Sequence, residues 1–518
     1  MTVGSASGKR FARQPLESTM TAHFLLHHLR ARHAPGEERL ARRSVLRRIA
    51  AASVALLAPA CKSGGLPPGA PNLGGRRVAV IGGGLGGLGC AADLCWAGYD
   101  VMVFEARASL GGRVRTLDGF APGRRVEAGA DFIGAQHSTW LGLARVHKLE
   151  LVEAFPGDLG EQPIVLDGRR LDAAESERLY EELAGLQHAL VQLATDVDAS
   201  QPWAHGEAAA LDARNLAEWL EDARPSELAQ SALRATFEAD LGVPPERASL
   251  LALLAAIRGG GLDEYWTLGR RLRCSGGNDQ LVRRLERRVG ASRMLLDTPV
   301  HAIRERADGY ELEVRGGERY RCADVVLAVP PAVWSRIEIE PPLPIQLAPQ
   351  SGARAKLLFA FATRAYDAAG GAPLYLGDGL VQRAFDPLAH DPNEFVHVLS
   401  CTSGGAAVER MRRIAESERR AVLALRELDL AWPGTSALPA NSRWIDWARE
   451  PWSLCGGTFP APGELTRQGP LVRAGCAGIR FAGEYASTAF PGTMEGALQS
   501  GLRIAGELGR RDGLRRVS

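Results

Sequence analysis

A glycine-rich stretch near residue 80, VAVIGGGLGGLG, has the composition of a phosphate-binding loop. Gly82, Gly84 and Gly87 follow an apolar run in G-x-G-x-x-G spacing, and apolar residues then recur at helical intervals. This order predicts a strand, a tight turn and a helix. The first glycine permits the turn, the second lets a pyrophosphate approach, and the third allows close packing, while the helix N-terminus offers unpaired N–H groups. The stretch therefore indicates a dinucleotide site, the alternative being a chance glycine turn.

The residues that follow could hold the rest of such a nucleotide. Glu105 ends the apolar segment VMVFE, about 20 residues beyond the first glycine, where an acidic group can accept hydrogen bonds from the adenosine ribose. Gly111 and Gly112 leave backbone N–H groups free to face an anionic phosphate, and Arg113 adds positive charge beside them. The alternative is a surface turn with solvated arginines.

Five segments together resemble the flavin-dependent amine oxidase family, which includes monoamine, polyamine and L-amino-acid oxidases. They are EARASLGGRVRT (105–116), VEAGADFIG (126–134), SGGNDQL (275–281), VVLAVPP (325–331) and GIRFAGEYASTAFPGTMEGALQSG (478–501). The first resembles the second FAD fingerprint of that family, so the resemblance implies that the cofactor is FAD. The likeness extends from about Arg76 to about Leu508.

The resemblance implies an α/β fold in which an FAD-binding Rossmann-like domain is interleaved with an α+β substrate domain, made of a mixed sheet and a helical subdomain. We assign residues 76–145, 270–345 and 456–510 to the FAD-binding domain, and 146–269 and 346–455 to the substrate-binding domain. Helical periodicity in ESERLYEELAGLQHALVQLA places a helix in the latter. The expected cofactor-binding residues are Gly82, Gly84, Gly86, Gly87, Glu105, Ala106, Arg107, Gly111, Gly112, Arg113, Val300, Gly483, Glu484 and Met494.

Several of these residues have roles that the resemblance suggests. The backbone of Val300 would contact adenine. Glu484 would accept hydrogen bonds from the ribityl or pyrophosphate region, unless it only caps a helix. A helix opening near Met494 would point its partial positive charge at the flavin, which favours the reduced ring.

The chain departs from the family pattern at the position of a lysine that binds a water near flavin N5. We align that position with Arg336, whose permanent charge would disfavour a nearby ammonium group. Arg336 is therefore the candidate catalytic residue, with a surface ion pair as the alternative, and Lys356 is assigned to a sheet. Two aromatic rings that monoamine oxidases place before the flavin are also missing, because the matching stretches offer Gly456 or Gly457, and Thr493.

Three further residues bear on the substrate and the flavin. Cys455 lies where monoamine oxidases bond the flavin covalently, and is a candidate for such a bond or a free small cysteine. The carboxylate-clamping Arg of L-amino-acid oxidases is absent around Asp131, which favours an amine over an amino acid unless Arg336 takes that role. His137 could assist a proton transfer, although a lone loop histidine is more often solvated or packed.

The expected function is FAD-dependent oxidation of an amine. A hydride passes from the amine carbon to flavin N5, water hydrolyses the imine, and O2 reoxidises the cofactor to give hydrogen peroxide. Two alternatives remain. One is an L-amino-acid oxidase, a tryptophan-monooxygenase-like enzyme or a flavin desaturase on the same fold. The other is a non-catalytic binding protein, since a fold does not establish an activity.

Composition and the N-terminal region bound the remaining possibilities. The 62 basic and 60 acidic residues nearly balance, which gives no indication of a nucleic-acid partner. The eight cysteines form no C-x-x-C pair, so no metal is expected. Residues 1–61 resemble an export signal with an extended n-region. Arg42 and Arg43 resemble a twin-arginine signal, and the apolar run 49–60 is too short to span a membrane.

This N-terminal pattern predicts a periplasmic protein or a membrane-anchored lipoprotein. Cys61 follows LAPA as in a lipoprotein cleavage site and is the candidate for lipidation, with export without an anchor as the alternative. Residues 62–75 are rich in Gly and Pro and are expected to form a flexible linker. Nothing in the sequence indicates the oligomeric state.

Overall fold

The computed structural model describes residues 75–514 except 156–160, 269–271, 368–371, 388–395, 439 and 477. The predicted export signal, Cys61 and the linker up to residue 74 lie outside the described residues. Within the described part, no helix is both long enough and apolar enough to span a membrane.

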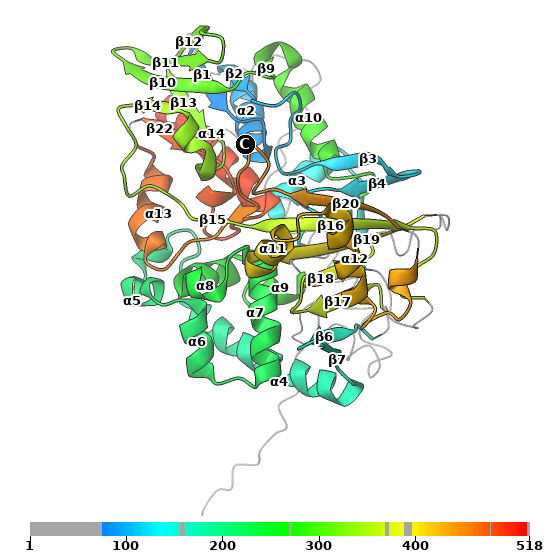
Figure 1. Cartoon of the computed structure of the whole chain (residues 1–518). Helices are drawn as coiled ribbons and strands as arrows, with labels where there is room; N and C mark the ends of the chain where they lie inside the picture. Colours follow the sequence, from blue (N-terminus) through cyan, green and yellow to red (C-terminus); the bar gives the residue numbers. More distant parts are fainter. Residues whose placement is uncertain are drawn as a thin grey trace, which may run out of the picture.

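A parallel sheet with the strand order β22-β13-β1-β2-β9 lies in the upper part of the molecule as viewed in Figure 1. Its strands are β1 (Arg77–Ile81), β2 (Asp100–Phe104), β9 (Met294–Leu295), β13 (Asp324–Leu327) and β22 (Ile479–Phe481). Every neighbouring pair is parallel. The strands come from residues 77–104, 294–327 and 479–481, which lie far apart in the sequence. The sheet brings their carboxyl ends to one edge, and ligands bind at this edge of such sheets.

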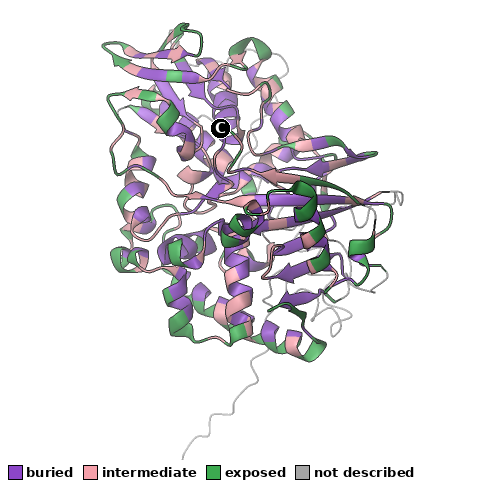
Figure 2. Cartoon of the chain, viewed as in Figure 1, coloured by how far each residue is buried: buried purple, intermediate pink, exposed green. Residues whose placement is uncertain are grey.

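Helices cover one face of this sheet, and a second sheet covers the other. The helices are α2 (Leu85–Trp96), α10 (Asp279–Val289) and α14 (Met494–Arg511). Val78 and Val80 pack with them, whereas Ala79 and Ile81 pack with the second sheet. This alternation along β1 explains the apolar run before the glycine loop, because both faces of the strand are buried (Figure 2).

The second sheet has the order β12-β11-β10-β14. It contains β10 (Val300–Arg306), β11 (Gly309–Val314), β12 (Arg319–Cys322) and β14 (Glu338–Glu340). The alternating segment YELEV lies in β11, and the turn at Gly316 and Gly317 joins it to β12. The alternating segment is therefore one arm of a β-hairpin.

A larger mixed sheet has the order β20-β16-β19-β18-β17-β6-β7. Its strands are β6 (Ile164–Leu166), β7 (Arg169–Arg170), β16 (Arg354–Phe361), β17 (Leu374–Gly377), β18 (Arg383–Phe385), β19 (His397–Gly404) and β20 (Ala440–Asp446). Pairing is antiparallel except between β17 and β6. Arg354 and Lys356 are the first and third residues of strand β16, close to the site described below.

A helical region lies at the end of the molecule away from β10–β12 (Figure 1). It contains α4 (Ala173–Ala194), α5 (Ala208–Ala213), α6 (Leu216–Ala223), α7 (Glu227–Leu241), α8 (Leu250–Gly259) and α9 (Asp263–Leu268). Asp172 and Glu175 form a capping box that starts α4. The helix predicted from ESERLYEEL is confirmed, and its apolar face packs into a core shared with α7 and α8.

Shorter elements connect these layers. They are β3 (Thr116–Ala121), β4 (Arg124–Glu127), α3 (Ser138–Val146), β5 (Leu151–Glu153), β8 (Leu272–Cys274), β15 (Ser351–Gly352), α11 (Gly405–Arg412), α12 (Ser417–Leu428), β21 (Gly457–Thr458) and α13 (Glu464–Ala474).

Candidate cofactor and substrate site

A cavity of about 940 Å³ runs from the carboxyl edge of the parallel sheet to the mixed sheet. It is lined by residues that follow β1, β2, β13 and β22, strands that lie far apart in the sequence. The predicted residues on its wall are Gly82, Gly84, Gly86, Glu105, Ala106, Arg107, Gly111, Gly112, Arg113, Val300, Arg336, Gly483, Glu484 and Met494. Gly87 and Cys455 are not among the lining residues.

The two glycine turns lie side by side at one end of this cavity. Gly111 N donates to Gly83 O at 2.8 Å, and Gly84 and Gly111 form an isolated β-bridge. A Cβ on Gly84 would meet nothing within 4 Å, whereas one on Gly87 would lie 2.0 Å from Gly82 O. The second glycine therefore leaves room in the cavity, and the third serves close packing, as the motif predicts.

Glu105 fixes the glycine loop through its carboxylate. Its Oε2 accepts from Gly83 N at 2.8 Å, and its Oε1 accepts from Arg107 N at 2.9 Å. Burial raises the pKa of Glu105 despite these hydrogen bonds. Arg107 in turn donates to Ser453 Oγ at 3.0 Å and pairs with Glu450. The segment around Ser453 is thus tied to the nucleotide end of the cavity.

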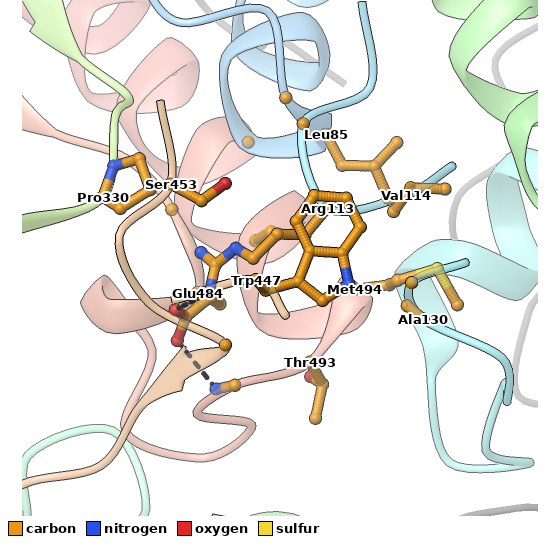
Figure 3. A pocket seen from close by; sticks show the side chains of 18 of the residues that line it. Leu85, Arg113, Val114, Ala130, Pro330, Trp447, Ser453, Glu484, Thr493 and Met494 are labelled. Atoms are coloured by element: carbon orange, nitrogen blue, oxygen red, sulfur yellow. Dashed lines mark hydrogen bonds and ion pairs between the residues drawn. The ribbon is translucent and has the colours of Figure 1, made fainter. Parts of the chain in front are cut away.

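Arg113 and Glu484 form an ion pair in the middle of the cavity wall (Figure 3). Arg113 Nη1 lies 2.9 Å from Glu484 Oε1. The other oxygen, Oε2, accepts from Thr458 Oγ1 at 2.7 Å and from Gly492 N at 2.9 Å. One carboxylate therefore holds together the second glycine turn, β21 and the loop before α14.

Helix α14 begins where the sequence predicted, at Met494. Its N-cap is Thr493, whose Oγ1 accepts from Gly496 N at 3.1 Å. Met494 and Ala497 line the cavity, so the positive end of the helix dipole faces it. Gly501 lets α14 lie directly on α2, because a Cβ there would be 2.1 Å from Gly86 O.

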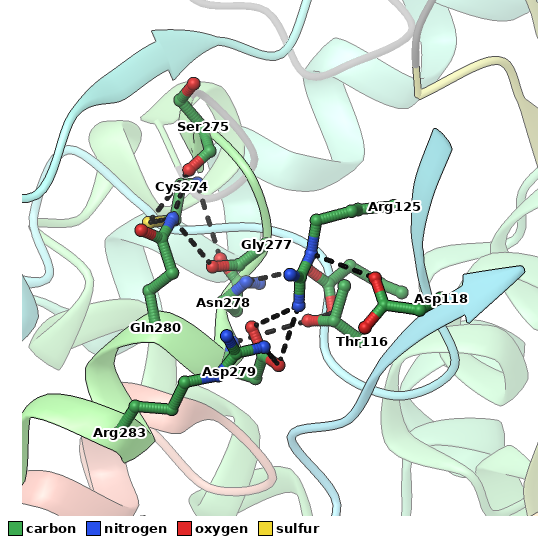
Figure 4. Close-up of polar contacts among 11 residues, drawn as sticks. Thr116, Asp118, Arg125, Cys274, Ser275, Gly277, Asn278, Asp279, Gln280 and Arg283 are labelled. Atoms are coloured by element: carbon green, nitrogen blue, oxygen red, sulfur yellow. Dashed lines mark hydrogen bonds and ion pairs between the residues drawn. The ribbon is translucent and has the colours of Figure 1, made fainter. Parts of the chain in front are cut away.

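The turn SGGNDQL is held by several polar contacts, among them those between Asp279 and Arg125 (Figure 4). Asn278 Nδ2 donates to Ala130 O at 2.8 Å and to Asp131 O at 2.9 Å. The next residue, Asp279, accepts two hydrogen bonds from Arg125 Nη2, at 3.1 and 2.9 Å. These bonds fix the backbone of the segment that carries Asp131 into the cavity.

The position of Lys356 on the cavity wall was not predicted from the sequence. The lysine lies in β16, as assigned, but it also lines the cavity, where its ammonium pairs with Asp131 and donates to Glu127 O at 3.0 Å. A lysine inside the apolar run RAKLLFAF was the available signal, because a buried lysine needs a partner.

Arg336, by contrast, is exposed. It donates to Pro451 O at 2.6 Å, and its guanidinium lies 5.5 Å from the Trp452 ring centroid. Arg336 also lines the cavity, but its guanidinium is already held by these two contacts.

The part of the cavity next to the mixed sheet contains aromatic rings and a further ion pair. Phe132 lies 5.6 Å from Phe155 and 4.9 Å from Phe385 between ring centroids. Arg383 pairs with Asp240 through two contacts, one of them 2.9 Å from Nη2 to Oδ2. This chamber therefore combines apolar walls with paired charges, as expected of a site for a small polar molecule.

His137 and Cys455 both lie near this site in buried positions. His137 lines the cavity, and its Nδ1 accepts from Gly134 N at 2.9 Å. Burial lowers the pKa of His137 to about 4, so its ring is neutral near pH 7. The Sγ of Cys455 lies 3.6 Å from Arg113 Nη1, and burial raises the pKa of this thiol. Neither group carries charge at neutral pH.

The lining residues fit FAD. An uncapped helix N-terminus at Leu85, two glycine turns, a buried acidic group and Arg113 match the needs of a dinucleotide. Beyond them the cavity continues into the aromatic chamber, which would leave space for a substrate beside a bound cofactor. Among the described residues, no group of His, Cys, Asp or Glu could hold a metal ion.

Comparisons with known proteins agree with this description. The family described as "Flavin containing amine oxidoreductase" matches residues 85–508. The "Probable flavin-containing monoamine oxidase A" of Dictyostelium discoideum is 26% identical over 460 residues, which is 83% of this chain and 97% of that protein. Putrescine oxidase of Kocuria rosea is 33% identical over 293 residues, 52% of this chain and 60% of the other.

A solved structure shows the same architecture. Cyclohexylamine oxidase from Brevibacterium oxydans IH-35A superposes with a TM-score of 0.76 and 26% identity, covering 84% of this chain and 99% of that chain. The α/β fold with mixed sheets and a helical region, expected from the sequence, is therefore confirmed.

Proposed function

The chain belongs to the flavin containing amine oxidoreductase family, and we propose that it oxidises an amine at the carbon next to nitrogen, with O2 as the electron acceptor. The family makes it an FAD-dependent amine oxidoreductase. The chemistry that FAD supplies when bound is acceptance of a hydride from the amine-bearing carbon and its delivery to O2, which yields an imine for hydrolysis and hydrogen peroxide.

The observation that carries this proposal is the single cavity shared by the two glycine turns, the Arg113–Glu484 pair and the aromatic chamber. Glycine turns and the N-terminus of α2 would hold the pyrophosphate, Glu105 the adenosine end, and the N-terminus of α14 would favour negative charge on the reduced cofactor. Phe132, Phe155 and Phe385 would exclude water from the substrate.

We assign the role of the family lysine to Lys356 rather than to Arg336. Lys356 is buried on the cavity wall, and its ammonium is held by Asp131 and Glu127 O. Arg336 is exposed and contacts Pro451 and Trp452. A group that positions water beside a reacting atom must be fixed and sheltered, which describes only the lysine of this pair.

The test is anaerobic mixing of the purified yellow protein with a panel of amines, with and without a carboxylate, while the flavin absorbance is followed. Bleaching by amines, followed by recovery and peroxide formation when air is admitted, supports the proposal. A colourless protein, or a yellow one that no amine bleaches, would refute it and favour the non-catalytic alternative. Bleaching by a substrate without nitrogen would favour a desaturase.

A further inference from the structure

The guanidinium of Arg354 lies against Gly457, one of the two candidates for a missing aromatic position, and against two further glycines. A Cβ on Gly457 would lie 2.8 Å from Arg354 Nη1, and one on Gly492 would lie 2.8 Å from Nη2. A third glycine, Gly242, faces the stem of the same side chain, since a Cβ there would be 3.0 Å from Arg354 Cγ. Side chains at these glycines would displace the guanidinium. These three glycines thus leave the space that the side chain of Arg354 occupies.

In the part of the chain that the structure describes, Arg354 donates hydrogen bonds to backbone carbonyls and to no carboxylate. Its Nη1 donates to Gly492 O at 3.2 Å, and its Nη2 donates to Asp240 O. Among the described residues, no carboxylate lies within ion-pair distance of it, and its Nε has no acceptor. Burial lowers the pKa of Arg354, but a guanidinium stays charged in a protein.

The two nearest carboxylates are already paired. Glu484 is bound by Arg113, and Asp240 is bound by Arg383 through both of its oxygens. Three guanidinium groups therefore share two carboxylates along this stretch of the cavity wall. The Lys356–Asp131 pair adds no net charge. One positive charge remains, and Arg354 borders the cavity.

A half-buried cation without a counterion is costly, and an anion that enters the cavity would offset this cost. The parallel N–H donors of a guanidinium match the two oxygens of a carboxylate. A diamine would instead bring a second ammonium towards an existing positive charge.

We propose that Arg354 binds the carboxylate of the substrate, so that the preferred substrates are amines that carry a carboxylate, that is, amino acids. This inference rests on the proposed amine oxidation and names its substrate class. It replaces the expectation that the lack of an arginine near Asp131 favours simple amines.

The experiment compares pairs of compounds that differ only by a carboxylate, L-phenylalanine with 2-phenylethylamine and L-ornithine with putrescine. The measured quantity is the second-order rate constant of anaerobic flavin bleaching by the wild-type holoenzyme. We expect the carboxylated member of each pair to react about 100-fold faster or more. Equal rates, or faster bleaching by the amines, would overturn the inference while leaving amine oxidation intact.

Variants of Arg354 then locate the recognition. Arg354→Met should abolish the preference for the carboxylated member, and Arg354→Lys should retain part of it, because a lysine keeps the charge without the fork. Arg420→Lys is the matched control, since Arg420 also donates to backbone carbonyls, of Met411 and Ile414, but lies outside the cavity lining. An unchanged preference in Arg354→Met would refute the assignment.

A binding measurement covers the cases in which turnover or folding fails. Benzoate is titrated into wild-type holoenzyme and the flavin spectrum is followed, with benzylamine as the cationic counterpart. A benzoate-induced change that Gly457→Ala weakens supports the inference, because the new methyl group would displace the guanidinium. No response of the wild-type flavin to benzoate would overturn the inference. Loss of flavin from the Arg354 variants would also overturn it, and would indicate that Arg354 binds the cofactor instead.

Discussion

Arg113 and Glu484 lie in segments at opposite ends of the folded chain, yet Nη1 of the arginine is 2.9 Å from Oε1 of the glutamate on the wall of one cavity. Glu484 also accepts from Thr458 and Gly492. The pair therefore joins the second glycine turn to the segment before α14, and the cavity depends on it.

Arg113→Met should reduce both stability and flavin content. Removal of the arginine leaves a buried carboxylate without its partner, which costs about 3 kcal/mol or more. The measurements are the free energy of unfolding by urea and the ratio of flavin to protein after purification. The control is Arg169→Met, which removes an exposed ion pair with Glu175 and should change neither quantity appreciably. Full flavin content in Arg113→Met would contradict the central position of this pair.

Lys356→Met should slow flavin bleaching by about 100-fold or more, whereas Arg336→Met should have little effect. The lysine is fixed on the cavity wall by Asp131, and the arginine is exposed beside Trp452. Stopped-flow absorbance with one good substrate measures both variants. Because Lys356→Met leaves Asp131 without its partner, the double variant with Asp131→Asn tests whether lost stability accounts for the effect. The reverse order of the two single variants would restore Arg336 as the catalytic candidate.

Glu127→Gln should remove a pH dependence of stability. Burial raises the pKa of Glu127 to about 7 from 4.5. A raised carboxyl pKa means that the folded state binds the proton more tightly, so this contribution is fully present below about pH 4.5 and is lost as the pH rises through 7. At 1.36 kcal/mol per pKa unit the loss is about 3 kcal/mol.

The measurement for Glu127 is the difference in Tm between wild type and variant at several values from pH 5 to pH 8. The Tm of wild type should fall relative to the Tm of Glu127→Gln as the pH increases. Glu181→Gln, at an exposed position of α4, is the control and should show a constant difference. A difference for Glu127→Gln that does not vary with pH would contradict the prediction.

Acid precipitation should release the flavin into the supernatant. Cys455 is buried, is not among the cavity-lining residues and has a thiol pKa raised by burial, so it is a poor nucleophile towards the flavin. Absorbance of supernatant and pellet decides the question. Yellow colour that stays in the wild-type pellet and disappears from it in Cys455→Ala would establish a covalent bond.

Replacement of Arg42 and Arg43 by Lys should keep the protein in the cytoplasm of its host. We propose that this arginine pair is a twin-arginine signal, in which the receptor reads both guanidinium groups. Cell fractionation followed by immunoblotting measures the distribution. For the proposed lipidation, Cys61→Ser should convert a membrane-bound fraction to a soluble one, and an unchanged distribution would argue for export without an anchor.

The local elements near the cofactor could be predicted from the sequence. Gly82, Gly84 and Gly87 specify a turn between a strand and a helix within a few residues. Thr493 likewise specifies the start of α14 as its N-cap. Such motifs are readable because a tight turn and a helix cap depend on neighbours in the chain, so residue type and spacing carry nearly all the information. Their resemblance to a family then indicated the cofactor.

The assignment of charged side chains to the cavity depended on the tertiary structure. Lys356 and Arg336 are both cations in or near strands, and only the packing of β16 against the segment of Asp131 decides that the lysine is buried and the arginine exposed. Arg354 enters the site because glycines at three distant positions leave room for it. Long-range packing sets burial and ion pairing, and a one-dimensional pattern does not contain it.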